Sequence, residues 1–213
     1  MHPKRSNSKE VIKMNNNKIR TITTYSILIA LMLVMAFTHL GYIKIGIAEI
    51  TLMSLPVIIG IGFAGVKGGL VLGTVFGLTS FIQCFGMSAF GQALFAINPF
   101  LTFLLCMVPR VLMGGLAGLI YEQMTKHNVK KAASYITLSV VAPLFNTLIF
   151  VPLTFGFFGR SEYIMGLATT LGAENLFALA ITLFGLNALL EVITCGIIGP
   201  ALLKALEKVS KQA

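Results

Sequence analysis

Four polar side chains lie inside otherwise apolar stretches of the sequence. Arg110 and Glu191 are ionisable, and Asn146 and Asn187 are amides. At about 1.5 Å of rise per helical residue, all four lie roughly 16–22 Å from the same end of their helices. Such groups at one depth either pair with one another, as in an Arg110–Glu191 ion pair between two helices, or contact a polar ligand. The sequence leaves both interpretations open.

The elements that position these residues are long and apolar. The chain has 213 residues, of which 56% are hydrophobic and 11% are charged, and its mean hydropathy is +0.90. A soluble domain has about 25% charged residues, and a membrane-spanning helix needs about 20 apolar residues. We therefore expect an all-α integral membrane protein, a bundle of six transmembrane helices. The apolar segments are 22–40, 51–65, 68–85, 99–121, 132–159 and 176–203.

The basic residues predict the orientation of this bundle. With the N-terminus inside, thirteen of the sixteen Lys and Arg residues lie on the inner side, whereas only Lys44 and Arg160 lie outside. Positive charge marks cytoplasmic loops, so both termini are expected in the cytoplasm of a multi-pass protein of the cell membrane. The same distribution explains the net charge of +9 without nucleic acid. The predicted parts are a basic cytoplasmic leader (1–20), a transmembrane domain (21–205) and a cytoplasmic tail (206–213).

Motifs for catalysis or metal binding are missing from the sequence. The three histidines have no H-x-x-x-H spacing, the three cysteines have no C-x-x-C spacing, and no G-x-S-x-G or phosphate-binding P-loop occurs. We expect no catalytic residue, no metal site and no cofactor, and we expect that the chain does not itself hydrolyse ATP.

Small residues recur at four-residue intervals. Gly65, Gly69, Gly73 and Gly77 form one such stripe, and Gly114 and Gly118 repeat the spacing. These stripes let helices approach closely in lipid, so we expect internal packing, with a docking surface for another protein as the alternative. Ser26 and Ala30 form a smaller stripe in the first segment.

Two outward connections contain further polar residues. The first, 41–50, contains Lys44, and the second, 83–98, contains Gln92 and Asn98. Because loops often carry binding groups, these residues are expected either at the rim of an outward-facing pocket or in ordinary connections.

Several motifs in the middle of the chain resemble one family. The stretches GYIKIG (41–46), LMSLPVIIGIGFAGVKGGLVLGTVFGLTSF (52–81), INPF (97–100), VPRVLMGGLAGLIY (108–121) and the Asn146-Thr147 pair occur in an order similar to that of the substrate-binding S components of energy-coupling factor (ECF) vitamin transporters. The order is most similar to the pantothenate-type branch. The resemblance is close over 40–155 and covers the remainder by topology.

This resemblance implies a six-helix bundle with both termini inside and an outward site capped by the connection between the first two helices. It also implies partners: a transmembrane coupling subunit and two cytosolic ATPase subunits, whose ATP hydrolysis drives toppling of the S component in the bilayer. The family packs an Ala-x-x-x-Ala-type helix face against the coupling subunit, and Ser26-x-x-x-Ala30 has the matching spacing.

The expected ligand is a water-soluble vitamin, and the best match is pantothenate. A buried carboxylate must be paired, and Arg110 or Lys44 can supply the cation. From depth and chemistry, the predicted substrate-binding residues are Lys44, Gln92, Asn98, Arg110, Asn146, Asn187 and Glu191.

Other functions remain open from the sequence. The S component can instead take folate, riboflavin or another small metabolite. A stand-alone secondary transporter is a different mechanism, disfavoured because the chain shows no repeated halves. A scaffold or a subunit of a membrane enzyme is a third class, disfavoured because polar groups converge at one depth without a catalytic motif.

Overall fold

The structure is a computed structural model that describes residues 6–38, 42–45 and 48–212, with side chains for 19–38 and 51–208. Within this part, five helices are long and apolar enough to cross a membrane. They are α1 (Ser6–Phe37), α2 (Ser54–Gln83), α4 (Pro99–Lys126), α5 (Lys131–Phe158) and the continuous run of α7 (Leu176–Ala180), a π-helical turn (Ile181–Gly185) and α8 (Leu186–Gln212).

The structure describes five candidate spans where the sequence predicted six segments, because the second and third predicted segments are joined in α2. Inside α2, Ala64 and Gly65 leave helical geometry, and Gly65 has a φ of 60° that favours glycine. The chain folds back there, so that a Cβ on Gly68 would collide with the carbonyl of Gly60. The first half of α2 has roughly ten residues and is about 15 Å long, about half of the hydrocarbon thickness.

The all-helical expectation holds for the bundle, and the connection before α2 is a short β-hairpin. Strands β1 (Tyr42–Ile45) and β2 (Ala48–Thr51) form an antiparallel hairpin in which Lys44 is opposite Glu49. Isoleucine and threonine, which favour extended backbone, supply four of its eight residues. Strand β2 contacts α8, so the hairpin lies against the helical bundle.

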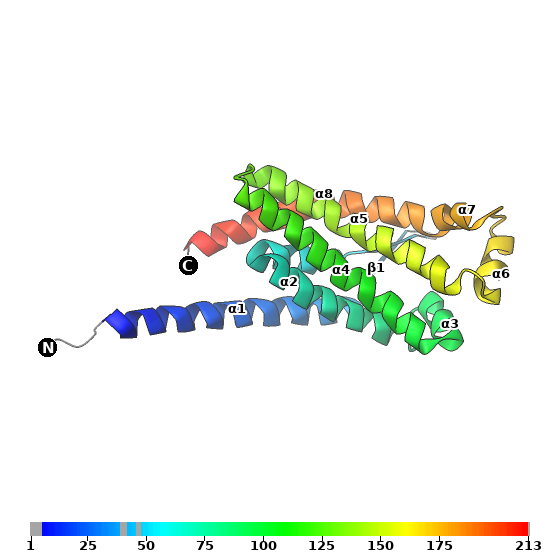
Figure 1. The fold of residues 1–213 in the computed structure, drawn as a ribbon, viewed down its shortest axis with the longest axis horizontal. Helices are drawn as coiled ribbons and strands as arrows, with labels where there is room; N and C mark the ends of the chain where they lie inside the picture. Colours follow the sequence, from blue (N-terminus) through cyan, green and yellow to red (C-terminus); the bar gives the residue numbers. More distant parts are fainter. Residues whose placement is uncertain (1–5, 39–41, 46–47, 213) are drawn as a thin grey trace.

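Two short helices occupy one end of the molecule. Helix α3 (Ala89–Ile97) is capped by Ser88, and α6 (Glu162–Thr170) is capped by Ser161. Both serine side chains accept a hydrogen bond from a backbone N–H of the first turn. Figure 1 shows both helices at the end opposite the start of α1 and the end of α8. The two ends of the described chain therefore share one side of the bundle.

Glycines join α2 to α4 at the centre of the bundle. A Cβ on Gly69 would collide with the carbonyl oxygen of Gly114, and a Cβ on Gly114 with that of Gly69. Further along, Gly73 lies against the backbone carbonyl of Arg110, and Gly118 lies against Val66. The prediction that the glycine stripes serve internal packing is confirmed.

Helix α1 packs more loosely than α2. Only 17% of its apolar window is buried, against 50% for α2. Leu28, Met32 and Ala36 face the core, whereas Ser26 and Ala30 are exposed on the other side. A broad face of α1 thus has no covering element among the described residues.

Candidate functional site

A cavity of about 680 Å³ lies at the end of the bundle that carries α3 and α6. Its wall is formed by the ends of α1 and α2, the start of α3, parts of α4, α5 and α6, and Leu183 of the π-helical turn. It reaches the surface at Met87, which is 58% exposed. The volume is within the range of small-molecule sites. Its polar wall residues are Thr38, Ser80, Gln83, Ser88, Thr102 and Arg110, and its aromatic ones are Phe37, Phe90, Phe150 and Tyr163.

Arg110 is the charged residue of this wall. Its Nη1 donates to the carbonyl of Leu105 at 3.0 Å. Its guanidinium carbon lies 4.8 Å from the ring centre of Phe150 and 5.4 Å from that of Phe76, which is cation–π geometry. Its buried Nε has no hydrogen-bond partner among the described residues. A guanidinium has five N–H donors, so Arg110 has donors left for an anionic ligand.

The helical repeat of α4 places Arg110 in the wall. Thr102, Cys106 and Arg110 follow one another at four-residue intervals, and all three line the cavity. Because Gly73 has no side chain, α2 can approach the backbone of Arg110 closely. The guanidinium is therefore held by a rigid pair of helices rather than by a loop.

The end of α2 connects the cavity to α1. The amide Nε2 of Gln83 donates to the carbonyl of Ala36 at 2.6 Å, and both residues line the cavity. This contact holds the C-terminal end of α1 at the cavity wall.

The structure separates the predicted site residues. Arg110 lines the cavity. Asn98 instead caps α4, because its Oδ1 accepts the N–H of Leu101 at 3.1 Å. Gln92 is exposed and is not in the cavity wall. Lys44 lies in β1, and its side chain is outside the described residues.

The remaining three predicted residues lie outside the cavity wall. Glu191 is 3% exposed and accepts a hydrogen bond of 2.5 Å from the hydroxyl of Ser54, at the start of α2. Asn146 and Asn187 each have a buried Oδ1 without a partner among the described residues. Within the described side chains Arg110 and Glu191 do not form the ion pair that was one expectation, because Ser54 bonds Glu191 and the aromatic rings enclose Arg110.

Several cavity residues were not predicted as site residues. Thr102, Cys106 and Arg110 share a four-residue spacing, which could have assigned Thr102 to the same helix face as Arg110. Tyr163 lies in α6, within a connection for which the sequence predicted no helix. Its position in the wall depends on packing that the local sequence does not encode.

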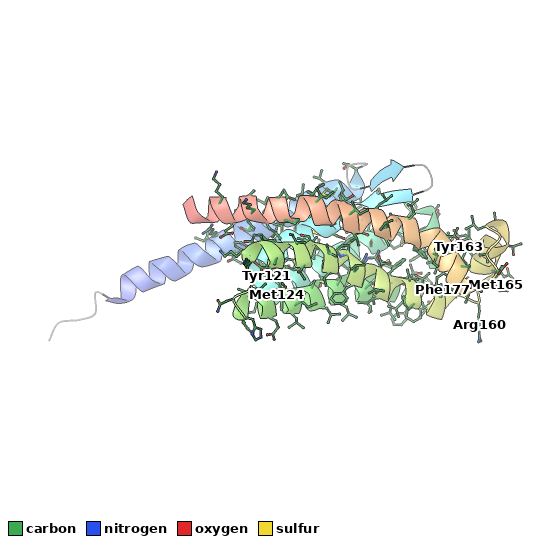
Figure 2. The ribbon with its side chains drawn as sticks, turned by 90° about the horizontal axis from the view of Figure 1, so that it is seen from above. Tyr121, Met124, Arg160, Tyr163, Met165 and Phe177 are labelled. Carbon is green, nitrogen blue, oxygen red and sulfur yellow. The ribbon has the colours of Figure 1, made fainter. Side chains whose placement is uncertain are left out.

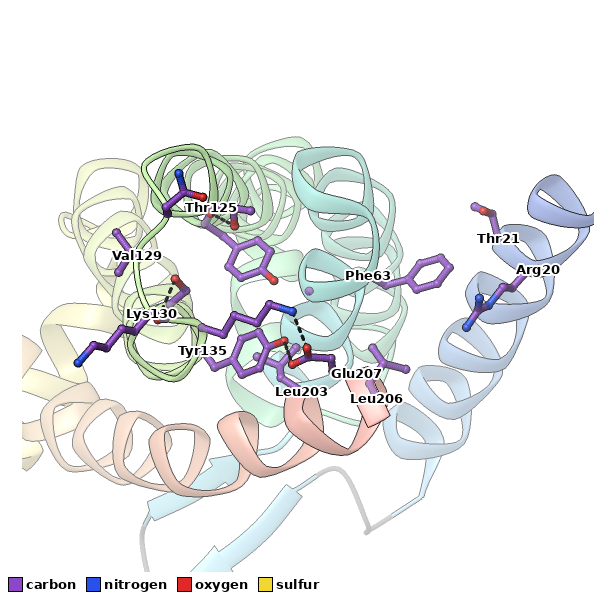
Figure 3. Close-up of a pocket in the computed structure, with 15 residues that line it drawn as sticks. Arg20, Thr21, Phe63, Thr125, Val129, Lys130, Tyr135, Leu203, Leu206 and Glu207 are labelled. Carbon is purple, nitrogen blue, oxygen red and sulfur yellow. Dashed lines mark hydrogen bonds and ion pairs between the residues drawn. The ribbon is translucent and has the colours of Figure 1, made fainter. Parts of the chain in front are cut away.

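A second cavity of about 840 Å³ lies among the end of α8, the α4–α5 turn and α1. Here Lys131 forms an ion pair with Glu207 at 2.5 Å, and the hydroxyl of Tyr135 donates to the same carboxylate at 2.9 Å (Figure 3). Tyr121 stacks on Tyr135 with 6.4 Å between ring centres. Figure 2 shows Tyr121 at one end of the bundle and Tyr163 at the other, so the two cavities lie at opposite ends.

The sequence matches a known family over nearly its whole length. The family described as "ECF transporter, substrate-specific component" matches residues 20–203. No curated protein matches the chain. The chain belongs to this family, the substrate-specific components of ECF transporters. It is therefore a transport subunit and a multi-pass membrane protein.

Proposed function

We propose that this substrate-specific component captures a water-soluble, carboxylate-bearing vitamin in the cavity of about 680 Å³, and that the vitamin is pantothenate. The observation that carries the proposal is Arg110, a cation in the cavity wall whose Nε has no partner among the described residues. A desolvated guanidinium with free donors binds a carboxylate strongly, because such charge-assisted hydrogen bonds are about twice as strong as neutral ones.

The other wall residues fit the rest of pantothenate. Its two methyl groups and carbon chain can pack on Phe150 and Tyr163, and its amide and hydroxyl groups can bind the hydroxyls of Ser80 and Thr102. Lys44 is our second candidate for the carboxylate, because β1 lies in the connection between α1 and α2. Gln92, Asn98, Asn146, Asn187 and Glu191 remain predictions as ligand contacts.

We further propose that the cavity opens to the outside and that both chain termini are cytoplasmic. The charge distribution supports this orientation, and so does the position of the described chain ends opposite α3 and α6 (Figure 1). In this orientation 1–20 is the cytoplasmic leader, 21–205 is the substrate-binding transmembrane domain and 206–213 is the tail. The β-hairpin with the first half of α2 takes the place of the sixth span.

The exposed face of α1 is our candidate surface for the transmembrane coupling subunit. Ser26 and Ala30 lie on this face together with Ile22 and Ile27, which are 65% and 63% exposed. Small residues allow a partner helix to approach closely. Two cytosolic ATPase subunits bound to that coupling subunit would drive toppling of the loaded chain and release of the vitamin inside.

Native mass spectrometry and thermal-shift titration of the purified chain test this function. We expect one retained small molecule, and a rise in melting temperature with pantothenate but not with folate or riboflavin. A shift with folate or riboflavin alone would transfer the function to that vitamin. Uptake by cells that lack the coupling and ATPase subunits would contradict the S-component mechanism and favour a stand-alone transporter.

A further inference from the structure

Two cysteines from different helices meet in the wall of the outer cavity. The Sγ atoms of Cys84 and Cys106 are 3.9 Å apart. Cys84 is the C-cap residue that follows Gln83, the last residue of α2, and Cys106 lies near the start of α4. Both line the cavity and are only 4% and 6% exposed. Neither thiol is needed for the ligand contacts proposed above.

This arrangement is close to that of a disulfide. A disulfide requires an S–S distance of about 2.05 Å, so the two sulfur atoms must approach by about 2 Å. Cys84 is favourably placed for this movement because it caps the end of α2 and a turn begins there, outside the regular helix. The wall of α4 can therefore stay in place while the end of α2 adjusts.

The surroundings favour the reactive thiolate form of Cys106. Arg110 lies one helical turn beyond Cys106 on the same face of α4, and a nearby cation stabilises a thiolate, which is the attacking species in thiol–disulfide exchange. The cavity reaches the surface beside Met87, so a small reagent can enter. Cys195, in contrast, is buried in α8 and does not line the cavity.

We propose that Cys84 and Cys106 are a reversible redox site, which closes to an intramolecular disulfide when a small organic disulfide enters the cavity. In the first step one cysteine thiolate attacks the organic disulfide, forms a mixed disulfide and expels one thiolate. In the second step the other cysteine attacks the sulfur of its neighbour and expels the second thiolate. The organic disulfide is thereby reduced to two thiols, which take up the two protons that the cysteines release.

Closure would join the end of α2 to α4 across the cavity wall. Because Gln83, the residue before Cys84, holds the end of α1 through Ala36, the bond would also restrict that contact. The shape of the cavity would then respond to the redox conditions at its open end. This inference depends on the geometry of the thiols and holds for any ligand of the cavity.

The probe is 2-hydroxyethyl disulfide, applied to the purified full-length chain in detergent. After removal of the probe, the chain is denatured, alkylated with N-ethylmaleimide, weighed and digested for peptide mapping. We expect the wild-type chain to lose the mass of two hydrogens and to keep one of its three thiols, that of Cys195. The digest should contain a pair of peptides linked through Cys84 and Cys106. Dithiothreitol should restore all three thiols.

Variants distinguish this site from general thiol reactivity. Cys195→Ser should close like the wild type, whereas Cys84→Ser should stop at a mixed disulfide on Cys106. Wild-type protein that keeps three alkylatable thiols, or a linked peptide that contains Cys195, would overturn the proposal. Peptide mapping of the wild type decides the question by itself if a serine variant fails to fold.

Discussion

The two cavities of the bundle differ in how their charges are satisfied. The cavity at the end of α8 is the larger, at about 840 Å³, yet its Lys131 and Tyr135 both bond the carboxylate of Glu207. The cavity between α3 and α6 is smaller, at about 680 Å³, and its Arg110 has a buried N–H without a partner among the described residues.

This difference shows that cavity volume alone does not identify the binding site. A charge that is already paired gains little from a ligand, whereas a desolvated donor without a partner gains a full charge-assisted hydrogen bond. The Lys131–Glu207–Tyr135 contacts are therefore suited to joining helix ends. The guanidinium of Arg110, which has a donor left over, is suited to binding an anion. Both cavities depend on the same glycine interface, because α2 and α4 run between them.

The most damaging change should be one that breaks this shared interface. Gly69→Ala places a Cβ against the backbone carbonyl of Gly114. This clash cannot be relieved by a change of rotamer, because the atom in the way belongs to the backbone. We expect a loss of about 3 kcal/mol or more in stability, measured as a large fall in the melting temperature. Ligand binding and the contacts of Lys131 and Tyr135 with Glu207 should be lost together.

Gly156→Ala is the matched control, because nothing lies within 4 Å of a Cβ at this position in α5. Equal melting temperatures for the two variants would show that the glycine interface does not hold the bundle together.

Arg110→Gln should separate the two cavities most clearly. It removes the cation of the cavity between α3 and α6 and leaves the Lys131–Glu207 pair intact. We expect the dissociation constant for pantothenate to rise roughly 10- to 100-fold, which corresponds to about 1.5–3 kcal/mol for a hydrogen bond to a charged group. Isothermal titration calorimetry measures this change.

The control for that variant is Arg160→Gln, which changes an exposed arginine near the same end of the molecule (Figure 2). If both variants weaken binding equally, long-range charge rather than direct contact is responsible.

Ser54→Ala tests a buried polar contact that belongs to neither cavity. It removes the hydroxyl that donates to Glu191 and leaves that carboxyl without this partner. We expect a loss of about 1–3 kcal/mol in stability, seen in thermal unfolding, with a smaller effect on ligand affinity than Arg110→Gln has. Ser26→Ala, on the exposed face of α1, should leave the unfolding of the isolated chain unchanged.

Lys131→Met should have the smallest effect. Its side chain is 69% exposed, and exposed ion pairs contribute about 0–1 kcal/mol. We expect a fall of a few degrees at most in melting temperature and less than a twofold change in pantothenate affinity. Lys130→Met, at a neighbouring cation of the same cavity, serves as the control. A tenfold loss of affinity in Lys131→Met alone would place the ligand in the cavity at the end of α8.

The sequence predicted the parts of this fold that depend on periodic spacing. The apolar segments and the glycine stripe of α2 follow from residue type at fixed intervals, and so does the position of Arg110 in a span. The fold-back of α2 was not predicted, because it depends on one positive φ at Gly65 within a continuous apolar run.

The candidate site was less predictable than the fold. Depth along a helix placed Arg110, Asn146, Asn187 and Glu191 together, but only Arg110 lines the outer cavity. Whether a residue at this depth lines the cavity depends on the direction of its side chain around the helix axis. That direction cannot be predicted for helices whose sequence has no clear polar face. Asn98 precedes Pro99, a local pattern typical of a helix start, and that signal explains its capping contact.

The proposed contact between Arg110 and a ligand carboxylate is tested most directly by a double-mutant cycle. In this cycle, calorimetry compares pantothenate with pantothenol, its alcohol analogue, on the wild type and on Arg110→Gln. We predict that the wild type binds pantothenate at least tenfold more tightly than pantothenol, and that the variant binds both alike. An undiminished preference for pantothenate in the variant would contradict the account.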